Sequence, residues 1–506
     1  MNLNIRRSGV VLHFTSLPGP HGSGDLGESA HCFVDWLAAA GQSVWQVLPV
    51  GPIGPGNSPY QSPSAFAGNP LLVALEPLVA RGWLDAIEPP EFDSARIEYG
   101  TVIAWRSARL HSAAAGFFAR AGAGDHAAFS SWREAQADWL ADWALFAALK
   151  NAHGGQPWWA WARGLAERDE DALTAARELH SGAVAAQEFV QWCFDEQMTA
   201  LRAYARCRGV LLMGDLPIFS AHDSADVWAR PDLYFLDDSH QPTVVAGVPP
   251  DAFTPDGQRW GNPLYRWSRM ADEGFAWWLA RVRRALTHAD LIRIDHFRGF
   301  AGYWEVPAHC PTARGGRWVP GPGKPLFEAI RAAFEATHNR LPIVAEDLGT
   351  ITPDVIELRD HFGFPGMRIV QEAFGSDASH SFLPHHFLPA CVAYTSTHDS
   401  DTAHGWWQGA PLAQRVFAAD YLRLGAEGIH QALMHAASTS VAQLAMAPMQ
   451  DVLGLDGSHR MNVPGTVAGN WVWRFTWAMV DDNVACRLAR LAAVTGRTPA
   501  DTGTTT

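Results

Sequence analysis

The sequence has little lysine, no paired cysteines and no long apolar run, and each shortage excludes a class of protein. Of its 38 lysines and arginines only two are lysines, Lys150 and Lys324, so a catalytic lysine or Schiff base has few candidates. The six cysteines never occur in a C-x-x-C spacing, which predicts reduced, buried thiols rather than zinc ligands or disulfides. No stretch of about 18 apolar residues occurs, so the sequence predicts a soluble protein of the cytoplasm without a membrane span.

The charge balance and the hydrophobic content narrow the class further. The 506 residues include 38 basic and 52 acidic side chains, a net charge of −14, which is unsuited to binding the phosphates of nucleic acid. Hydrophobic residues make up 48% of the chain, enough to fill a large core and to exclude wholesale disorder. The 23 tryptophans fit either core packing or platforms for sugar rings, and composition alone does not separate these two uses.

Short apolar runs that end in polar or acidic residues recur along the chain, with helical patterns between many of them. Runs of this kind show little alternation and are typical of parallel strands that are buried on both faces. Eight such units predict an α/β fold, a (β/α)₈ TIM barrel. The runs occupy residues 9–17, 43–51, 209–219, 291–299, 342–349, 366–374, 391–399 and part of 440–454.

Two connections are too long for simple crossovers, and they predict insertions into a single catalytic barrel over residues 1–500. Residues 66–208 are rich in tryptophan and in helical patterns, and they predict a largely helical insertion between strands two and three. Residues 220–270 contain the Pro/Gly-rich stretch VVAGVPPDAFTPDGQRWGNPLY and predict a structureless loop that covers the active site. We expect a disordered tail at 495–506 and no C-terminal β-sandwich.

Four acidic residues follow predicted strands, and in a parallel barrel the carboxyl ends of the strands meet at one face. A charge at the end of an apolar run is costly unless it is paired or functional, although any single one of these acids could be a helix cap or a salt-bridge partner. Arg293 lies two residues before Asp295, on the same side of its strand, and it could keep that acid ionised. The four acids are Asp215, Asp295, Glu346 and Asp399, and two of them are followed or preceded by a histidine, His296 and His398.

Paired carboxylates without a lysine, a zinc motif or a phosphate-binding loop suit the chemistry of glycosidic bonds. Breaking an acetal needs one carboxylic acid to protonate the leaving oxygen and one carboxylate to face the developing cation. Arg293 favours an ionised Asp295 as the nucleophile, which leaves Glu346 as the general acid/base. Asp399 and His398 would then hold sugar hydroxyls.

An ordered set of motifs resembles the amylomaltases, the 4-α-glucanotransferases of glycoside hydrolase family 77, which are relatives of the α-amylase barrels. A single RIDHFRG would be a weak signal, but the motifs follow one another in family order over nearly the whole chain, from residue 7 to residue 474. They are LHFTSLPGPHGSGDLG, WQVLPVGPIGPGNSPYQSPSAFAGNP, GDLPIF, AGVPPDAF…GQRWGNPLY, RIDHFRGF, AEDLG, YTSTHDSDT and MQDVLGLDGSHRMNVPGT…NWVWR.

The resemblance implies transfer of an α-1,4-glucan segment to the 4-OH of another glucan or of glucose, through a covalent glycosyl-enzyme and without a metal or cofactor. The substrates would be malto-oligosaccharides, amylose or glycogen-derived chains. Asp295 would be the nucleophile, Glu346 the general acid/base and Asp399 the carboxylate that stabilises the transition state. The other residues expected to bind substrate are Tyr60, Asp215, Arg293, His296 and His398, with Asp251, Phe253, Trp260 and Asn262 from the loop over the acceptor side.

Some positions depart from the family pattern, and other functions compete. Phe14, Ser220, Ser396 and Ser400 replace commoner residues, and the two serines nearest Asp399 could alter the geometry of the donor site.

An α-1,4-glucan hydrolase of the α-amylase or α-glucosidase type uses the same intermediate and would release it to water. A metal-dependent lyase or isomerase would use the same acids as a magnesium triad, but the near-absence of lysine argues against it. A catalytically inactive glucan-binding protein would not need intact carboxylates.

Overall fold

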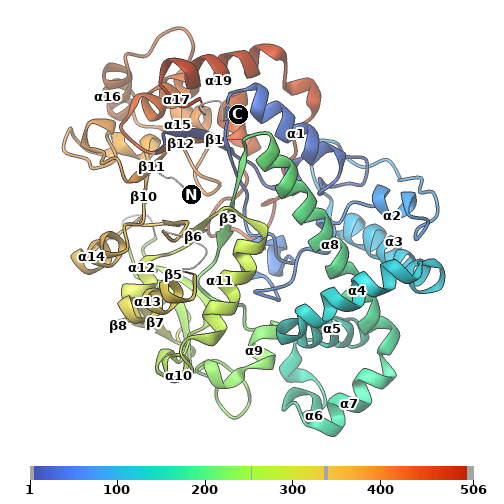
Figure 1. Cartoon of the computed structure of the whole chain (residues 1–506). Helices are drawn as coiled ribbons and strands as arrows, with labels where there is room; N and C mark the ends of the chain where they lie inside the picture. Colours follow the sequence, from blue (N-terminus) through green and yellow to red (C-terminus); the bar gives the residue numbers. More distant parts are fainter. Residues whose placement is uncertain (1–4, 252–253, 335–339, 499–506) are drawn as a thin grey trace.

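The computed structural model describes residues 5–251, 254–334 and 340–498, and eight parallel strands close into a barrel. Each of the eight predicted runs overlaps one strand, so the predicted (β/α)₈ barrel is confirmed. Around the barrel the order is β1-β12-β11-β10-β9-β6-β3-β2, with each strand parallel to its neighbours (Figure 1). The strands are β1 (Arg7–Val11), β2 (Val44–Gln46), β3 (Leu211–Leu216), β6 (Leu291–Ile294), β9 (Ile343–Ala345), β10 (Gly366–Ile369), β11 (Cys391–Tyr394) and β12 (Leu444–Pro448).

The barrel interior is filled by apolar side chains from all eight strands, and this packing decides which side chains point inward. One buried cluster combines Val11, Val44, Met213, Leu291, Val344, Met367, Val392 and Leu444 with a few neighbours. Ile292 and Ile294 instead join the cluster between the sheet and the outer helices. Because side chains alternate along a strand, residues two positions after an interior residue also face inward. Asp215, Arg293 and Glu346 therefore lie above Met213, Leu291 and Val344 at the carboxyl ends of their strands.

The segment between β2 and β3 is mostly helical and lies on one side of the barrel (Figure 1). Its longest helix, α8, packs against α3 and α5 and also against the barrel helix α1 (Glu28–Ala39). The predicted limits of the insertion, residues 66–208, stay a prediction, because α8 packs both on the helices of this segment and on the barrel helix α1. No described helix is long and apolar enough to cross a membrane. The helices are α2 (Glu76–Ala80), α3 (Tyr99–Arg120), α4 (Ala123–Ala135), α5 (Ala137–Ala152), α6 (Arg163–Ala166), α7 (Glu170–Leu179) and α8 (Ser181–Cys207).

A second, antiparallel sheet stands beside the barrel, where the sequence predicts a structureless loop. Its order is β5-β4-β7-β8, with β4 (Val244–Val248), β5 (Gln258–Pro263), β7 (Gly302–Pro307) and β8 (Arg317–Pro320). Residues 220–270 also contain the short helices α9 (Ala225–Ala229) and α10 (Trp267–Asp272). The sequence does not reveal these strands because glycine and proline interrupt the alternation, and the β4–β5 register shifts between Val245 and Gly247.

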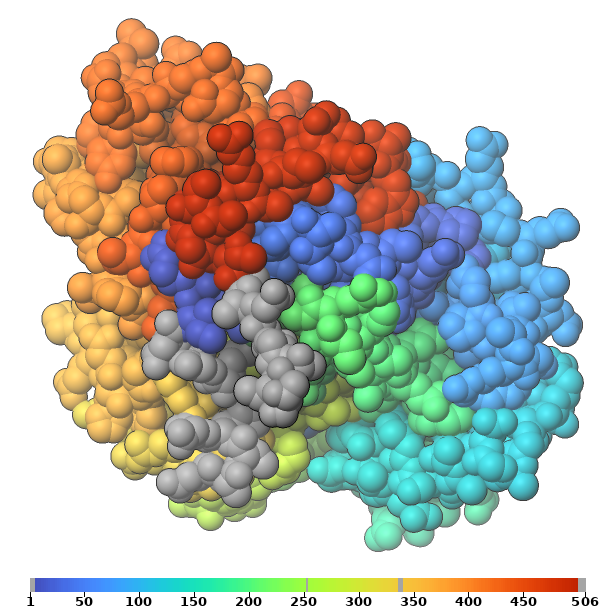
Figure 2. Space-filling view, turned by 45° about the horizontal axis from the view of Figure 1, so that its top comes forward, coloured from blue at the N-terminus to red at the C-terminus, as the bar shows by residue number. Residues whose placement is uncertain are grey.

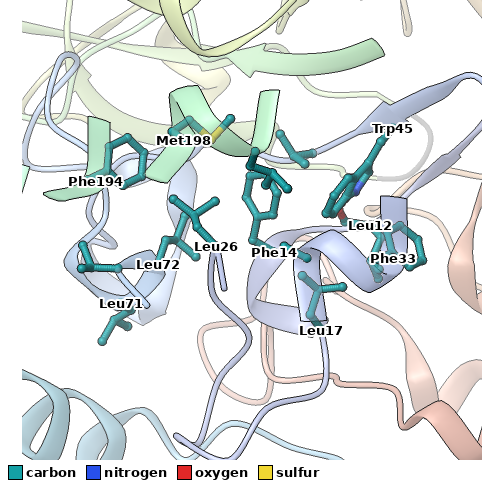
Figure 3. Packing of buried hydrophobic residues seen from close by; sticks show 14 of the residues in the cluster. Leu12, Phe14, Leu17, Leu26, Phe33, Trp45, Leu71, Leu72, Phe194 and Met198 are labelled. Carbon is teal, nitrogen blue, oxygen red and sulfur yellow. The ribbon is translucent and has the colours of Figure 1, made fainter. Parts of the chain in front are cut away.

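The two ends of the described chain pack together. Helix α19 (Asp482–Val494, red) lies against α1 (blue) on the surface in Figure 2. Beneath α1, large apolar side chains such as Phe14, Phe33 and Trp45 form the core, with the Phe14 and Trp45 ring centroids 4.9 Å apart (Figure 3). The described chain after β12 contains α18 (Met449–Leu453) and α19 and no β-sandwich.

The structure differs from the predicted disordered tail at residues 495–498, which are described. Arg497 is fully buried and donates hydrogen bonds to the carbonyl oxygens of Arg7 and Ser438, each at 2.8 Å. Composition gives no signal for this contact, because a lone arginine in a polar tail is usually solvated. The rest of the predicted tail, 499–506, lies outside the described residues.

Candidate active site

Arg293 lies at the centre of the acids that follow the barrel strands. Its Nη1 donates to both carboxylate oxygens of Asp215, at 2.7 and 2.8 Å, and its Nη2 lies 2.8 Å from Oδ1 of Asp295. Burial lowers the pKa of the guanidinium, but the charges of Asp215 and Asp295 outweigh burial and raise the pKa above its ordinary value. Arg293 is therefore a permanent cation between two carboxylates, as the i, i+2 spacing predicts for Asp295.

Tyr60 connects this ion pair to the carboxyl end of β11. Its hydroxyl donates to Oδ2 of Asp215 at 2.7 Å and lies 2.8 Å from Nε2 of His398. The Tyr60 and His398 rings stack with centroids 5.3 Å apart and 9° between their planes. Burial, followed by the charge of Asp215, raises the pKa of Tyr60 well above its ordinary value, so the phenol stays neutral and donates a hydrogen bond.

A sharp turn after Asp295 joins the nucleophile candidate to Glu346. His296 has a left-handed backbone (φ 51°), which a non-glycine residue adopts at a cost, and strain of this kind is typical of functional sites. In this conformation its backbone N–H donates to Oε2 of Glu346 at 2.6 Å. The backbone N–H of Leu348 donates to Oε1 at 2.8 Å, so both carboxyl oxygens of Glu346 are held.

Glu346 and Asp295 lie in different electrostatic surroundings. Burial, followed by the negative charge of Asp295, raises the pKa of Glu346 to about 8, although Arg293 and the two backbone donors oppose the shift. Nη2 of Arg293 lies 2.8 Å from Oδ1 of Asp295, so Asp295 has a cation beside it. Glu346 is thus the acid of this pair that is protonated near neutral pH.

Asp399 is the most exposed of the four acids, and residues after β12 hold it. Its side chain is 47% exposed, and Nε2 of His398 lies 3.4 Å from Oδ2. Nδ2 of Asn462 donates to Oδ1 at 2.6 Å, and Arg460 donates to the Asp399 backbone carbonyl at 2.9 Å. The sequence reasoning missed Asn462 and Arg460, although both lie in the quoted motif SHRMNVPGT, because neither residue type indicates catalysis by itself.

A pocket of about 260 Å³ lies beside Asp295 and Asp399. These two acids line it together with Tyr60 and the acceptor-loop residues Trp260 and Asn262, whereas the other predicted site residues at the barrel, Glu346 among them, are not lining residues. The remaining lining residues include Gln61, Phe219, Gln258, Asn462 and Trp471, of which the sequence reasoning identified none. An aromatic wall beside paired carboxylates is suited to a sugar, whose C–H faces stack on rings while its hydroxyls bind polar groups.

The predicted acceptor loop only partly reaches this pocket. Trp260 contacts the edge of the His296 ring, with centroids 4.8 Å apart, and Asn262 is buried, donating to the Ser220 carbonyl and accepting from Gln61. Asp251 is exposed and is not among the lining residues, because its carboxylate accepts hydrogen bonds from Thr254 instead. Phe253 lies outside the described residues.

One group of described residues has the spacing of metal ligands, and it involves none of the predicted site residues. The potential ligand atoms of His21, Asp25 and Glu76 lie within 4.8 Å of one another. Arg106 contacts Asp25 at 3.2 Å and already supplies a positive charge there. At the barrel, Arg293 supplies the positive charge beside Asp215 and Asp295.

Comparisons with known proteins agree with the pocket. A glycoside hydrolase family 77 model, described as 4-alpha-glucanotransferase, matches residues 12–480. The 4-alpha-glucanotransferase of Thermus thermophilus is 48% identical over 97% of this chain and 99% of its own, and that of Synechocystis is 45% identical over 98% and 99%. The structure of an amylomaltase from Streptococcus agalactiae in complex with acarbose superposes with a TM-score of 0.93, at 35% identity over 97% of this chain and 100% of that one. The chain therefore belongs to glycoside hydrolase family 77, the 4-alpha-glucanotransferases.

Proposed function

We propose that this 4-alpha-glucanotransferase works by a retaining double displacement on Asp295, Glu346 and Asp399. In the first step Asp295 attacks the anomeric carbon of the donor glucan while Glu346 protonates the departing glycosidic oxygen. In the second step Glu346, now ionised, takes a proton from the 4-OH of an acceptor glucan or glucose. That oxygen displaces Asp295, and the α-1,4 linkage is formed again.

The observation that supports these roles most directly is that Glu346 and Asp295 have different surroundings. The pKa of Glu346, raised to about 8, keeps it protonated at neutral pH, as a general acid requires. Asp295, whose Oδ1 lies 2.8 Å from the Arg293 guanidinium, is suited to attack as a carboxylate. Transfer of the Glu346 proton to the leaving oxygen in the first step leaves a carboxylate, which can then accept the proton of the acceptor hydroxyl in the second step.

The remaining polar groups are proposed to bind the donor sugar. Asp399 lines the pocket, and Asn462 holds its Oδ1 at 2.6 Å, so Oδ2, 3.4 Å from Nε2 of His398, can accept a hydrogen bond from a sugar hydroxyl. His398, Asp215 and Arg293 form the network beneath it, and Tyr60 gives one ring face to His398. Trp260 and Asn262 are proposed to contact the acceptor side, together with His296. Asp251 stays a prediction, and so does the cytoplasmic location.

The competing activity is hydrolysis of the same bonds, which differs only in whether water or a sugar hydroxyl displaces Asp295. Trp260 and Phe219 give the pocket an aromatic wall, with ring centroids 6.4 Å apart. Such a wall binds an acceptor sugar better than it binds water, and this favours transfer.

Incubation of the purified protein with maltotriose alone tests the proposed activity. We expect a ladder of longer maltodextrins together with glucose, resolved by chain length over time. Formation of glucose and maltose without longer products would mean that the protein hydrolyses the bond rather than transferring the glycosyl group. Trapping with a fluorinated glucosyl fluoride, followed by peptide mass spectrometry, tests the mechanism: the label is expected on Asp295, and a label elsewhere would refute the assignment.

A further inference from the structure

Trp318, on β8, is the most exposed of the described tryptophans. Its exposed fraction is 42%, whereas the other described tryptophans are buried or half-buried. Burying an aromatic ring of this size is favourable, because it removes apolar surface from water. The exposure of Trp318 is therefore notable among the described tryptophans. It lies on the edge strand of the antiparallel sheet whose opposite edge, β5, provides Trp260 to the catalytic pocket.

The Trp318 ring is held in place from two sides. The Arg298 guanidinium carbon lies 3.8 Å from the ring centroid, in cation–π contact. Trp304, its cross-strand partner on β7, packs edge-on with centroids 5.1 Å apart and 69° between the planes. A ring fixed in this way loses little conformational entropy when a ligand stacks on it.

Arg298 is itself unusual, because it is a buried cation with few partners. Its exposed fraction is 7%, and within the described part of the chain it forms no ion pair. Its Nη1 donates a hydrogen bond to the carbonyl oxygen of Thr350, and its Nε is buried without a partner among the described residues. The buried guanidinium therefore serves to hold the exposed Trp318 ring in place.

The Trp318–Arg298 pair lies at the loops that hold the catalytic acids. Arg298 begins α12 (Arg298–Ala301), three residues after Asp295, and Thr350 follows Glu346 by four residues. The backbone N–H of Gly321, just after β8, donates to the Ala301 carbonyl at 2.8 Å. The exposed ring is thus attached to the β6 and β9 loops, and Figure 1 shows β7, β8 and α12 side by side.

We propose that Trp318 and Arg298 form a remote glucan subsite, outside the catalytic pocket and on the Glu346 side, where a distant glucosyl unit of a long chain stacks on Trp318. The inference rests on the proposed function, since it takes an α-1,4-glucan as the ligand. A pyranose presents a face of C–H groups to the exposed part of the ring, which Arg298 holds in place. Trp318 does not line the catalytic pocket, so we expect a long glucan that extends past Glu346 to gain this contact and maltotriose not to.

The surroundings of Trp318 favour a sugar over a protein partner. Its strand neighbour Arg317 is exposed and pairs with Glu305 at 2.7 Å, and nearby Lys324 pairs with Glu357 at 2.7 Å. A protein interface presents a contiguous apolar patch, whereas here one aromatic ring stands among charged groups. That combination is the usual composition of a carbohydrate platform.

The test compares two substrates in the Trp318→Ala variant. With maltotriose as sole substrate we expect kcat and KM within about twofold of the parent protein, because the catalytic pocket is untouched. With amylose we expect KM to rise about five- to tenfold at unchanged kcat, the factor for the loss of one stacking contact. Trp318→Phe, which keeps a ring, is expected to recover most of the loss.

The matched control is Phe118→Ala on α3, which removes another aromatic ring of 42% exposure. It is expected to leave both substrates unchanged. An equal effect of Trp318→Ala on maltotriose and amylose would overturn the subsite, because the ring would then only support the catalytic loops; no effect on either would overturn it as well. If the parent protein makes no maltodextrin ladder from maltotriose, the proposed function fails instead, and the two failures are distinct.

Discussion

At the scale of single residues, the pKa of Glu346 gives the enzyme a definite pH dependence. The first step needs protonated Glu346, whose pKa is raised to about 8 by burial and by Asp295. We therefore expect kcat/KM for maltotriose to fall as the pH rises through about 8, measured over pH 6 to 10. Glu346→Gln cannot donate a proton, and it is expected to lose about 10²–10⁴-fold in activity.

A substrate that needs no acid separates this role from damage to the fold. Fluoride leaves without protonation, so α-maltosyl fluoride is expected to glycosylate Glu346→Gln at close to the parent rate, whereas Asp295→Asn stays inactive with it. The folded pKa of Glu346 exceeds its unfolded value, so its ionisation weakens folding as the pH rises from about 4.5 to 8. The melting temperature of the parent protein should therefore fall more between pH 5 and pH 8 than that of Glu346→Gln, which has no group to ionise at this position. An equal fall in the two proteins, or equal loss of activity on both substrates, would contradict the assignment.

At the scale of elements, the sequence predicts the repeated barrel strands and misses the irregular strands of the second sheet. All eight barrel strands show as apolar runs because parallel strands are buried on both faces, and the acids after them stand out against that background. Strands β4 and β5 do not show, because Gly247 and the neighbouring prolines remove the alternation that marks an antiparallel strand. Asn462 lies beside Asp399 through folding alone, since 63 residues separate them in the chain.

A buried carboxylate on α18 predicts how the Asp399 segment keeps its shape. Asp451 is 1% exposed and accepts hydrogen bonds from the hydroxyls of Thr395 and Ser396, both at 2.6 Å, and from the backbone N–H of Ala403 at 2.7 Å. It thus ties both ends of the turn that presents His398 and Asp399. Asp451→Ala leaves these donors unsatisfied, and we expect a loss of about 2–4 kcal/mol in unfolding free energy with a fall of at least tenfold in kcat.

Ser396→Gly is a smaller change that measures the contribution of one of these hydrogen bonds. It removes one of the three hydrogen bonds that Asp451 accepts, so we expect a cost of about 1 kcal/mol and kcat within about threefold. Thermal unfolding and maltotriose kinetics measure both variants. If Asp451→Ala unfolds at a lower temperature but keeps full kcat well below that temperature, Asp451 stabilises the protein without positioning Asp399.

At the scale of the whole molecule, the pocket is assembled from residues between Ser58 and Trp471, which lie 413 positions apart, so it exists only when the barrel is closed. Closure happens between β1 and β12, which come from the two ends of the chain. The carboxyl ends of the strands therefore hold the site, and contacts at the amino ends of the strands hold the barrel closed.

Arg497 is the contact that tests this division. Its guanidinium donates to the carbonyl oxygens of Arg7 at 2.8 Å, Ser438 at 2.8 Å and Ala442 at 2.9 Å, which precede or begin the two closing strands. Arg497→Ala removes these hydrogen bonds and leaves a cavity where the fully buried side chain was, so we expect a loss of about 3–5 kcal/mol in unfolding free energy. Because the catalytic residues lie at the opposite end of the barrel, kcat and KM for maltotriose should stay within about twofold at temperatures where the variant is folded.

The exposed Arg490 on α19 provides the matched control, since Arg490→Ala removes the same side chain from the surface and is expected to change stability by less than about 0.5 kcal/mol. Denaturant unfolding of both variants, with maltotriose kinetics at 25 °C, makes the comparison. Equal stability of the two variants would mean that the barrel closes without Arg497, as the prediction of a disordered tail implies. A fall in kcat in the folded Arg497→Ala variant would mean instead that strain at the closing end reaches the catalytic acids through β1 and β12.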